Sequence, residues 1–330
     1  MNILVLSATA SAINYIRTLT GDPEIILHLT DCNPTCPGLY AAGVVPHLVP
    51  RASQKDAYLQ ALDRIIAKEK IDLLIPTSDY DMAAVMELLH SGWNPPVKLF
   101  RPPRESFAIL SDKRNLAKTM QSWLPDHIPQ SFSLEEIDNL RTFPLVVKPR
   151  NQSGGHGVSI VRDRESLLLA VDKLRESIGD ALLVQEYIDG STHVVVMVYD
   201  AEGRQVVALP LASHLTFFTW GGGGCAGEIM SDPSLVALAT RVIECAGGWC
   251  GPINLEFRRQ KESGRYYLME GNCRLNGYSY LTTMNNVPLP RAIISLLTHT
   301  PLPSLRPGHQ PVPFVLGFRE RVIEKWIGQS

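Results

Sequence analysis

Three oxygen-bearing side chains near the end of the chain have the spacing of metal ligands on two neighbouring strands. Glu270 and Asn272 are two residues apart in the run 266–274, so on a strand both point to the same face. Glu256 lies in the preceding apolar run, and a turn-like segment, 261–265, joins the two runs. Carboxylate and amide oxygens are hard ligands, which suit Mg²⁺. The spacing therefore predicts a magnesium site on adjacent strands.

A glycine-rich segment lies between two predicted strands and is suited to covering phosphate groups. Residues 143–149 and 158–161 are the predicted strands, and Gly154, Gly155 and Gly157 lie between them. Glycine permits positive φ, which lets several N–H groups of one loop point into a concavity that binds anions. The segment joins two strands and lacks a Gly-Lys-Ser/Thr ending, so it is not a Walker A motif. An ordinary hairpin turn is the alternative.

Two lysines complete the set. Lys148 lies on the strand before the glycines, where a buried ammonium group is placed to pair with phosphate oxygens. Lys113 is predicted to begin a helix that runs to Met120. Alone, Lys113 would be interpreted as a solvated helix residue. Together with the glycines and the acidic residues downstream, the two lysines indicate the chemistry of a nucleoside triphosphate.

The first hundred residues alternate predicted strands and helices, which indicates a parallel α/β sheet. The predicted first turn, 7–11, contains no glycine and G-x-G-x-x-G is absent, so NAD binding is not expected. A proline-rich stretch at 101–103 is the predicted boundary. The expected strands are 2–7, 24–29, 71–76 and an edge strand at 97–100.

Beyond residue 104, strand pairs and helices are segregated, which is an α+β pattern. Helices are expected at 165–177, 232–246 and 289–297. Asp232 and Pro233 are suited to the N-cap and N1 positions of the second of these helices. The expected strands are 143–149, 158–161, 182–188, 192–199, 205–211, 252–257 and 265–270.

Composition excludes several classes of protein. The chain has 330 residues, of which 45% are apolar and 19% charged, as in a globular protein with two or three lobes. A net charge of −2 gives no reason to expect a nucleic-acid partner, and no apolar run is long enough to predict a membrane span. The six cysteines form no paired C-x-x-C units, so reduced thiols and a cytoplasmic location are expected. A zinc site at Cys32 and Cys36 is the alternative.

The ordered set of motifs resembles the ATP-grasp family, and most of all its carbamoyl-phosphate-synthase-like carboxylate–amine ligases. The resemblance covers about residues 105–305. It implies a Rossmann-like pre-ATP-grasp α/β domain over 1–104 and a two-lobed ATP-grasp domain over 105–330. The lobes would be 105–188, with the glycine-rich loop, and 189–330, with the metal-binding strands. The motifs are Lys113, Lys148, Gly154–Gly157, Gln185-Glu186-Tyr187-Ile188, Asn254-Leu255-Glu256-Phe257 and Glu270-Gly271-Asn272-Cys273-Arg274.

The resemblance also implies roles for individual residues. Arg274 and Lys148 would be the catalytic groups, with Arg274 on the transferred phosphate. Glu256, Glu270 and Asn272 would hold one or two Mg²⁺ ions, for which Mn²⁺ is a substitute. Glu186 and Ile188 would meet the adenine edge, mainly through their backbone groups. The full set expected to bind ATP is Lys113, Lys148, Ser153, Gly154, Gly155, Gly157, Gln185, Glu186, Tyr187, Ile188, Thr192 and His193.

The sequence departs from the family pattern in three places. Thr192 or His193 stands where the family often has a ribose-contacting Glu, and both alternatives remain open. Cys273 replaces the usual proline before Arg274. The insert 221–224, four glycines in a row, is expected to be a flexible loop over the acceptor site. Cys225 beside it has no identifiable His or Asp partner and is interpreted as a bystander thiol.

Family chemistry implies that a carboxylate attacks the γ-phosphate to give an acyl phosphate and ADP, after which an amine displaces the phosphate. The substrates would be a small carboxylate and an amine, such as an amino acid or small peptide, and a homodimer fits the family. Arg274 and Asn276 are candidate substrate contacts; Asp31, Ser78 and Asp79 are weaker ones, with capping as their alternative role. The rival functions are an ATP-grasp kinase or carboxylating enzyme that makes an acyl or carbamoyl phosphate, and a non-catalytic nucleotide-binding module.

Overall fold

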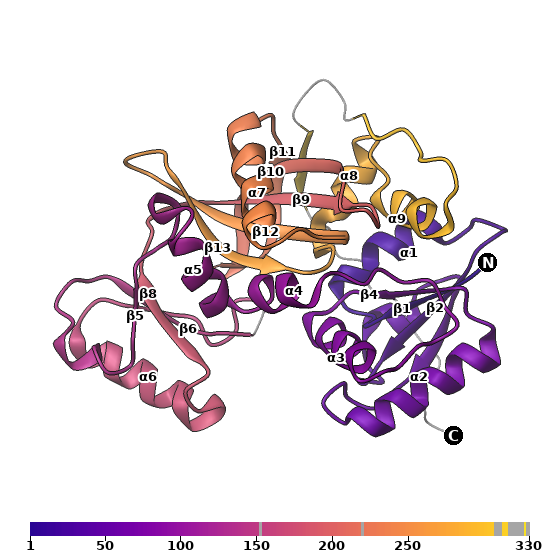
Figure 1. Cartoon of the computed structure of the whole chain (residues 1–330), viewed down its shortest axis with the longest axis horizontal. Helices are drawn as coiled ribbons and strands as arrows, with labels where there is room; N and C mark the ends of the chain where they lie inside the picture. Colours follow the sequence, from indigo (N-terminus) through magenta and orange to yellow (C-terminus); the bar gives the residue numbers. More distant parts are fainter. Residues whose placement is uncertain (152–153, 219–220, 307–311, 316–326, 328–330) are drawn as a thin grey trace.

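A computed structural model describes residues 1–151, 154–218, 221–306, 312–315 and 327. Three sheets form its framework (Figure 1). The N-terminal sheet, in indigo, and the small sheet beside α6 lie at opposite ends of the view, and the six-stranded sheet lies above and between them. Five short 3-10 helices connect the larger elements within the described residues: η1 (Ala10–Ala12), η2 (Pro37–Tyr40), η3 (Pro125–His127), η4 (Ile137–Asn139) and η5 (Gly277–Ser279).

The N-terminal sheet is parallel and has the order β3-β2-β1-β4. Alternation along the strands divides its side chains between two cores. Leu4 and Leu6 face α2 and α3, whereas Ile3 and Val5 face α1. The elements are β1 (Asn2–Leu6), α1 (Ile13–Leu19), β2 (Ile26–Asp31), β3 (Val44–Leu48), α2 (Lys55–Glu69), β4 (Leu73–Pro76) and α3 (Asp79–His90).

Two details of this sheet differ from the sequence prediction. β3 was not predicted, because its run Val-Val-Pro-His-Leu is short, half-buried and interrupted by a proline. The edge strand expected at 97–100 forms only an isolated bridge between Leu73 and Lys98. A single bridge adds no further ladder of backbone hydrogen bonds, so this segment is a connection toward the next part of the chain.

The small sheet is antiparallel, with the order β5-β8-β6-β7, and α6 covers one face. Leu167 and Val171 of α6 pack with Val147 and Val184 of the central strands. Asp163 begins this helix with a capping box that includes Ser166. The elements are α4 (Arg104–Leu110), α5 (Lys113–Gln121), β5 (Ser131–Phe132), β6 (Leu145–Pro149), β7 (Ser159–Val161), α6 (Arg164–Ile178) and β8 (Leu182–Glu186).

The largest sheet is antiparallel and has the order β13-β12-β9-β10-β11-β14. Its strand β9 is buried on both faces, which explains the unbroken apolar run 194–199. Val194 and Val196 pack in the core that contains the N-terminal sheet, and Val195 and Met197 pack in the core beneath α7. The elements are β9 (Gly190–Tyr199), β10 (Gln205–Phe218), β11 (Gly221–Ile229), α7 (Pro233–Cys245), β12 (Gly251–Gln260), β13 (Tyr266–Asn272), α8 (Tyr280–Met284), α9 (Leu289–Thr298) and β14 (Val312–Val315).

The glycine run 221–224 is not the loop that the sequence predicted. Its backbone begins β11, which pairs antiparallel with β10; Gly221 lies opposite Phe218 and Gly224 opposite Thr216. Glycine lowers strand propensity but does not prevent extended pairing when neighbouring strands supply the hydrogen bonds. Tertiary pairing therefore overrode the local preference of these residues.

Among the helices of the described residues, none combines the length and the apolar character that crossing a membrane requires.

Candidate functional site

The three residues predicted as metal ligands lie together on paired strands. β12 and β13 are antiparallel neighbours, and their register places Glu256 opposite Glu270. The Asn272 amide Nδ2 donates to Glu256 Oε1 at 3.1 Å and to Glu270 Oε1 at 3.3 Å. Two carboxylates and one side-chain amide therefore converge within one small region, with the amide nitrogen turned toward the carboxylates.

The two buried carboxylates repel each other, and the nearby lysine affects them unequally. Burial raises the pKa of Glu256 above the usual range of a carboxyl, and the neighbouring Glu270 charge raises it further. Burial also acts to raise the pKa of Glu270, but Lys113 outweighs it and holds that pKa below its usual value. A divalent cation would remove the repulsion between the two carboxylates, so the residues present fit Mg²⁺.

Close packing of α4 against β13 brings Lys113 to this site. A Cβ on Gly271 would lie 2.6 Å from the carbonyl oxygen of Leu110, so only glycine allows this approach. The Asp112 carboxylate then caps α5 by accepting from the backbone N–H groups of Arg114 and Asn115. Lys113, at the start of α5, places its Nζ 2.7 Å from Glu270 Oε2.

Lys148 approaches the same site from the small sheet. Its side chain extends from β6 and is 5% exposed. Burial and the nearby Lys113 charge lower the pKa of Lys148 to about 8. The next turn of chain is fixed by an ion pair in which Arg150 Nη2 lies 2.8 Å from Asp112 Oδ2. Helix α5 and strand β6 therefore place two ammonium groups beside the carboxylates of β12 and β13.

The lowered pKa of Lys148 predicts a pH dependence for binding of a phosphate-bearing ligand. Below about pH 8 the ammonium group of the free protein is charged, and above it the charge is lost. Affinity for ATP should therefore fall as the pH rises through this value, because a neutral amine attracts phosphate less. Calorimetric titration from pH 6.5 to 9.5 measures this. Lys148→Arg, which stays charged, should lose this dependence, and an unchanged profile in that variant would contradict the assignment.

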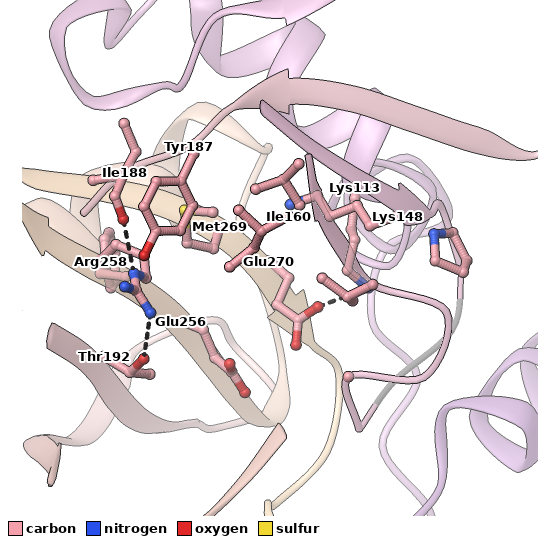
Figure 2. A pocket seen from close by; sticks show the side chains of 15 residues that line it. Lys113, Lys148, Ile160, Tyr187, Ile188, Thr192, Glu256, Arg258, Met269 and Glu270 are labelled. Carbon is pink, nitrogen blue, oxygen red and sulfur yellow. Dashed lines mark hydrogen bonds and ion pairs between the residues drawn. The ribbon is translucent and has the colours of Figure 1, made fainter. Parts of the chain in front are cut away.

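A pocket lies between the small sheet and the six-stranded sheet (Figure 2). Figure 2 shows Lys113 and Lys148 at one end, Glu270 between, and Ile188 and Arg258 at the other end. Apolar side chains line the intervening walls. The lining residues are Lys113, Val146, Lys148, Pro149, Gly155, Val158, Ile160, Tyr187, Ile188, Thr192, Glu256, Phe257, Arg258, Met269 and Glu270. The pocket is thus charged at one end and largely apolar towards the other, which suits a nucleotide.

The predicted phosphate loop has the backbone that glycine permits. Gly154, Gly155 and Gly157 have φ values of 74°, 74° and 72°. Gly155 lines the pocket next to Lys148. Ser153, which was also predicted to bind the nucleotide, lies outside the described residues.

Of the predicted adenine-binding segment, Tyr187 and Ile188 line the pocket. The side chains of the two residues before them do not. Gln185 is buried and donates to Ser131 Oγ at 3.0 Å. The Glu186 carboxylate accepts from the Gln130 backbone N–H at 3.3 Å, beside a separate surface groove. The side chains of Gln185 and Glu186 therefore point away from the pocket, and a contact of this segment with adenine through its backbone groups stays a prediction.

Strand alternation decides between the two residues that were candidates for the ribose contact. Thr192 lines the pocket, whereas His193 points to the other face of β9. There its Nε2 lies 2.8 Å from Ser191 Oγ and its ring packs edge-on against Tyr266. Burial lowers the pKa of His193 to about 4, so the ring is neutral at physiological pH. Of the two alternatives the structure favours Thr192, and the ribose contact itself stays a prediction.

Arg274, the predicted phosphate contact, is buried and bonded to protein. Its Nη2 donates to Asp79 Oδ2 at 2.7 Å and to Asn272 Oδ1 at 3.1 Å. Its Nη1 donates to Ser11 Oγ at 3.4 Å. Arg274 therefore connects the segment after β13 to the start of α3 and to η1, and it is not among the residues that line the pocket. A role on the transferred phosphate remains a prediction.

The other substrate candidates, Asn276 and the weaker Asp31 and Ser78, lie near this junction, where the carboxyl ends of β1, β2 and β4 meet. Ser78 caps α3 by accepting from the Asp81 backbone N–H, so its alternative role as a cap is confirmed. Asp31 accepts from the Ala8 backbone N–H at 3.1 Å. Asn276 accepts from Ser279 Oγ, and its backbone carbonyl accepts from Asn14. These residues hold the junction together through hydrogen bonds.

Arg258 is the charged pocket residue that was not predicted from the sequence. Arg258 is two positions after Glu256 on β12, so both point to the same face. The same period-two argument that paired Glu270 with Asn272 would have found it.

The alternative zinc site receives no support. Cys32 is exposed and Cys36 is buried, with its thiol directed to the Ala8 carbonyl oxygen at 3.1 Å. In the part of the chain that the structure describes, no three His, Cys, Asp or Glu side chains gather as metal ligands would.

The family model described as "ATP-grasp domain" matches residues 110–278. The carbamoyl phosphate synthase large chain of Thermoplasma acidophilum is 25% identical over 242 residues, covering 68% of this chain and 23% of that protein. The chain thus spans under a quarter of the length of this relative.

Two solved structures share the fold. A biotin carboxylase from Campylobacter jejuni, solved as a β-γ-ATP complex, has a TM-score of 0.71 and 18% identity, covering 92% of this chain and 72% of that chain. An L-amino acid ligase from Bacillus licheniformis has a TM-score of 0.64 and 17% identity, covering 90% of this chain and 74% of that chain.

Proposed function

This chain belongs to the ATP-grasp family, and from that premise we propose that it is an ATP- and Mg²⁺-dependent ligase that forms ADP. It would activate a carboxylate as an acyl phosphate and join it to an amine, plausible substrates being amino acids or small peptides. The observation that carries the proposal is the convergence of Glu256, Glu270 and Asn272 with Lys113 in a pocket whose remaining walls are mainly apolar. Such a set is more than nucleotide binding alone requires.

The residues divide the chemistry between them. Mg²⁺ bound by Glu256, Glu270 and Asn272 would neutralise charge on the β- and γ-phosphates. Lys148 would hold phosphate oxygens from the opposite wall, and the backbone N–H groups of the glycine loop would cover them. Closure of that loop would exclude water, which otherwise hydrolyses an acyl phosphate. Phosphoryl transfer of this kind depends on positioning and charge, so no protein nucleophile is needed.

The assignment of the domains follows from the same proposal. Residues 1–104 would be the pre-ATP-grasp domain and 105–330 the ATP-grasp domain, with lobes 105–188 and 189–330. Shared packing of Val194 and Val196 with the N-terminal sheet supports a first domain fixed against the second lobe. Within the smaller lobe, residues 137–184 have a separate core around Val147 and Leu167, which allows this part to move as a lid.

A carboxylating enzyme is the second candidate, and the likeness to a biotin carboxylase favours it. In that reaction bicarbonate would be the carboxylate that receives the γ-phosphoryl group. The ligase and the carboxylating enzyme differ in the co-substrate that ADP formation requires: an amine with a carboxylate for the first, and bicarbonate for the second.

The test measures phosphate release with Mg²⁺-ATP while amino acids are offered singly and in pairs, with and without bicarbonate. A ligase should release phosphate only when a carboxylate and an amine are both present, and mass spectrometry should find the amide. Release that depends on bicarbonate and never on an amine would support carboxylation and overturn the ligase proposal. Absence of any ADP formation across the screen, with Mg²⁺-ATP still bound, would favour a binding module.

A further inference from the structure

Arg258 is held in place by acceptors from the segment that joins the two lobes. Its Nε donates to the Ile188 carbonyl oxygen at 3.2 Å and its Nη2 to the Gly190 carbonyl oxygen at 2.6 Å. Its Nη1 donates to Thr192 Oγ1 at 3.4 Å. Hydrogen bonds of a guanidinium group lie in its plane, so this arrangement fixes the plane and leaves its faces without hydrogen-bond partners.

The joining segment is itself fixed to β12. The Lys261 backbone N–H donates to the Asp189 carbonyl oxygen at 2.9 Å. A Cβ on Gly190 would lie 1.9 Å from the Arg259 carbonyl oxygen, so the close approach requires glycine. Three consecutive carbonyl groups, 188 to 190, are therefore bonded to β12, and Arg258 supplies two of those bonds. The guanidinium position is thus set by a rigid frame.

Arg258 carries a positive charge that no carboxylate of the described residues neutralises by an ion pair. Its partners are carbonyl and hydroxyl oxygens, and its Cζ lies 6.0 Å from the centroid of the Tyr187 ring. The side chain lines the pocket at the end away from Lys148 (Figure 2). Val146 and Ile160 of the small sheet line the same pocket.

We propose that Arg258 forms part of the floor of the nucleobase site, where its guanidinium group stacks on the base of the bound nucleotide. A flat, electron-rich ring fits between the apolar side chains of Val146 and Ile160 and a cation presented from β12. The phosphates would then extend toward Lys148 and the carboxylates. This inference rests on the proposed function, because it assumes that a nucleotide occupies the pocket.

The test compares three ligands in calorimetric titrations: Mg²⁺-ADP, adenosine, and inorganic tripolyphosphate with Mg²⁺. In Arg258→Leu the dissociation constants of ADP and adenosine should rise by about 5- to 30-fold, the range for a desolvated cation–π contact. That of tripolyphosphate, which has no base, should stay within about twofold, as expected for a ligand that lacks the stacked group. Arg258→Gln keeps amide donors for the carbonyl oxygens and should lose affinity for ADP and adenosine in the same selective way. This second variant keeps the test decisive if the leucine variant misfolds.

Arg259→Leu is the matched control. Arg259 is the next residue on β12, points to the other face over the Tyr266 ring and donates to the Gly264 carbonyl oxygen. The Arg259→Leu variant should therefore have the same dissociation constants as the wild type for all three ligands. Equal weakening of all three ligands in both Arg258 variants would show that Arg258 only holds the lobes, and unchanged ADP affinity would likewise overturn the inference. Failure of the wild type to bind ADP or tripolyphosphate would instead overturn the proposed function and this inference with it.

Discussion

Replacing Glu270 with glutamine should lower the rate of ATP-dependent product formation by about 10²- to 10⁴-fold. A metal ion contributes several kcal/mol to stabilising charge on a transferring phosphoryl group, and each 1.36 kcal/mol changes a rate tenfold. Glu270 is the carboxylate whose pKa is held low by Lys113, so it is ionised and ready to accept a cation. Glutamine keeps the size and an oxygen acceptor for Asn272 but removes the charge. Steady-state assays with saturating substrates measure the loss.

The fold should survive this change because the site contains a second carboxylate. Burial and the Glu270 charge keep the pKa of Glu256 high, so removing that charge lets Glu256 ionise more easily. An ionised Glu256 then compensates part of the Lys113 charge. Circular dichroism and the melting temperature should remain close to those of the wild type. Glu262→Gln, an exposed position in the turn between the two strands, is the control and should keep full activity. A Glu270→Gln enzyme with nearly normal turnover would refute the metal assignment.

The period-two pattern of strands was the sequence feature that predicted the cluster of Glu256, Glu270 and Asn272. Glu270 and Asn272 share a face because they are two residues apart, and the register of β12 and β13 then places Glu256 opposite Glu270. The same rule separates Thr192 from His193, which the sequence left undecided until the strand and its buried face were known. Alternation along a single strand therefore predicted correctly which side chains share a face.

Contacts between segments that are distant in the chain could not be predicted from the sequence. Arg274 and Asp79 are 195 residues apart, yet their ion pair connects β13 to the first helix after β4. Lys113 reaches Glu270 only because Gly271 admits the end of α4. The glycines at 221–224 became part of a strand because β10 pairs with them. Each of these outcomes depends on a neighbour supplied by the fold, which no local propensity encodes.

Replacing Lys148 with methionine should raise the dissociation constant of ATP by about 10- to 100-fold or more, since a charge-assisted hydrogen bond to phosphate contributes about 1.5–3 kcal/mol. The same ammonium group would stabilise charge during phosphoryl transfer, so kcat should fall as well. Calorimetry with Mg²⁺-ATP and a steady-state assay separate these two effects.

Stability should change in the opposite direction from binding. Lys148 is buried on β6 beside the Lys113 charge, and its lowered pKa means that holding it charged at pH 7 costs free energy. Methionine removes that cost and fits the same space, so the free energy of unfolding of the ligand-free variant should equal or exceed that of the wild type. Lys173→Met, an exposed position on α6 in the same lobe, should leave both properties unchanged. Loss of ATP affinity accompanied by lower stability would assign Lys148 a structural role, whereas weaker binding by a protein at least as stable identifies a buried charge that is retained for its ligand.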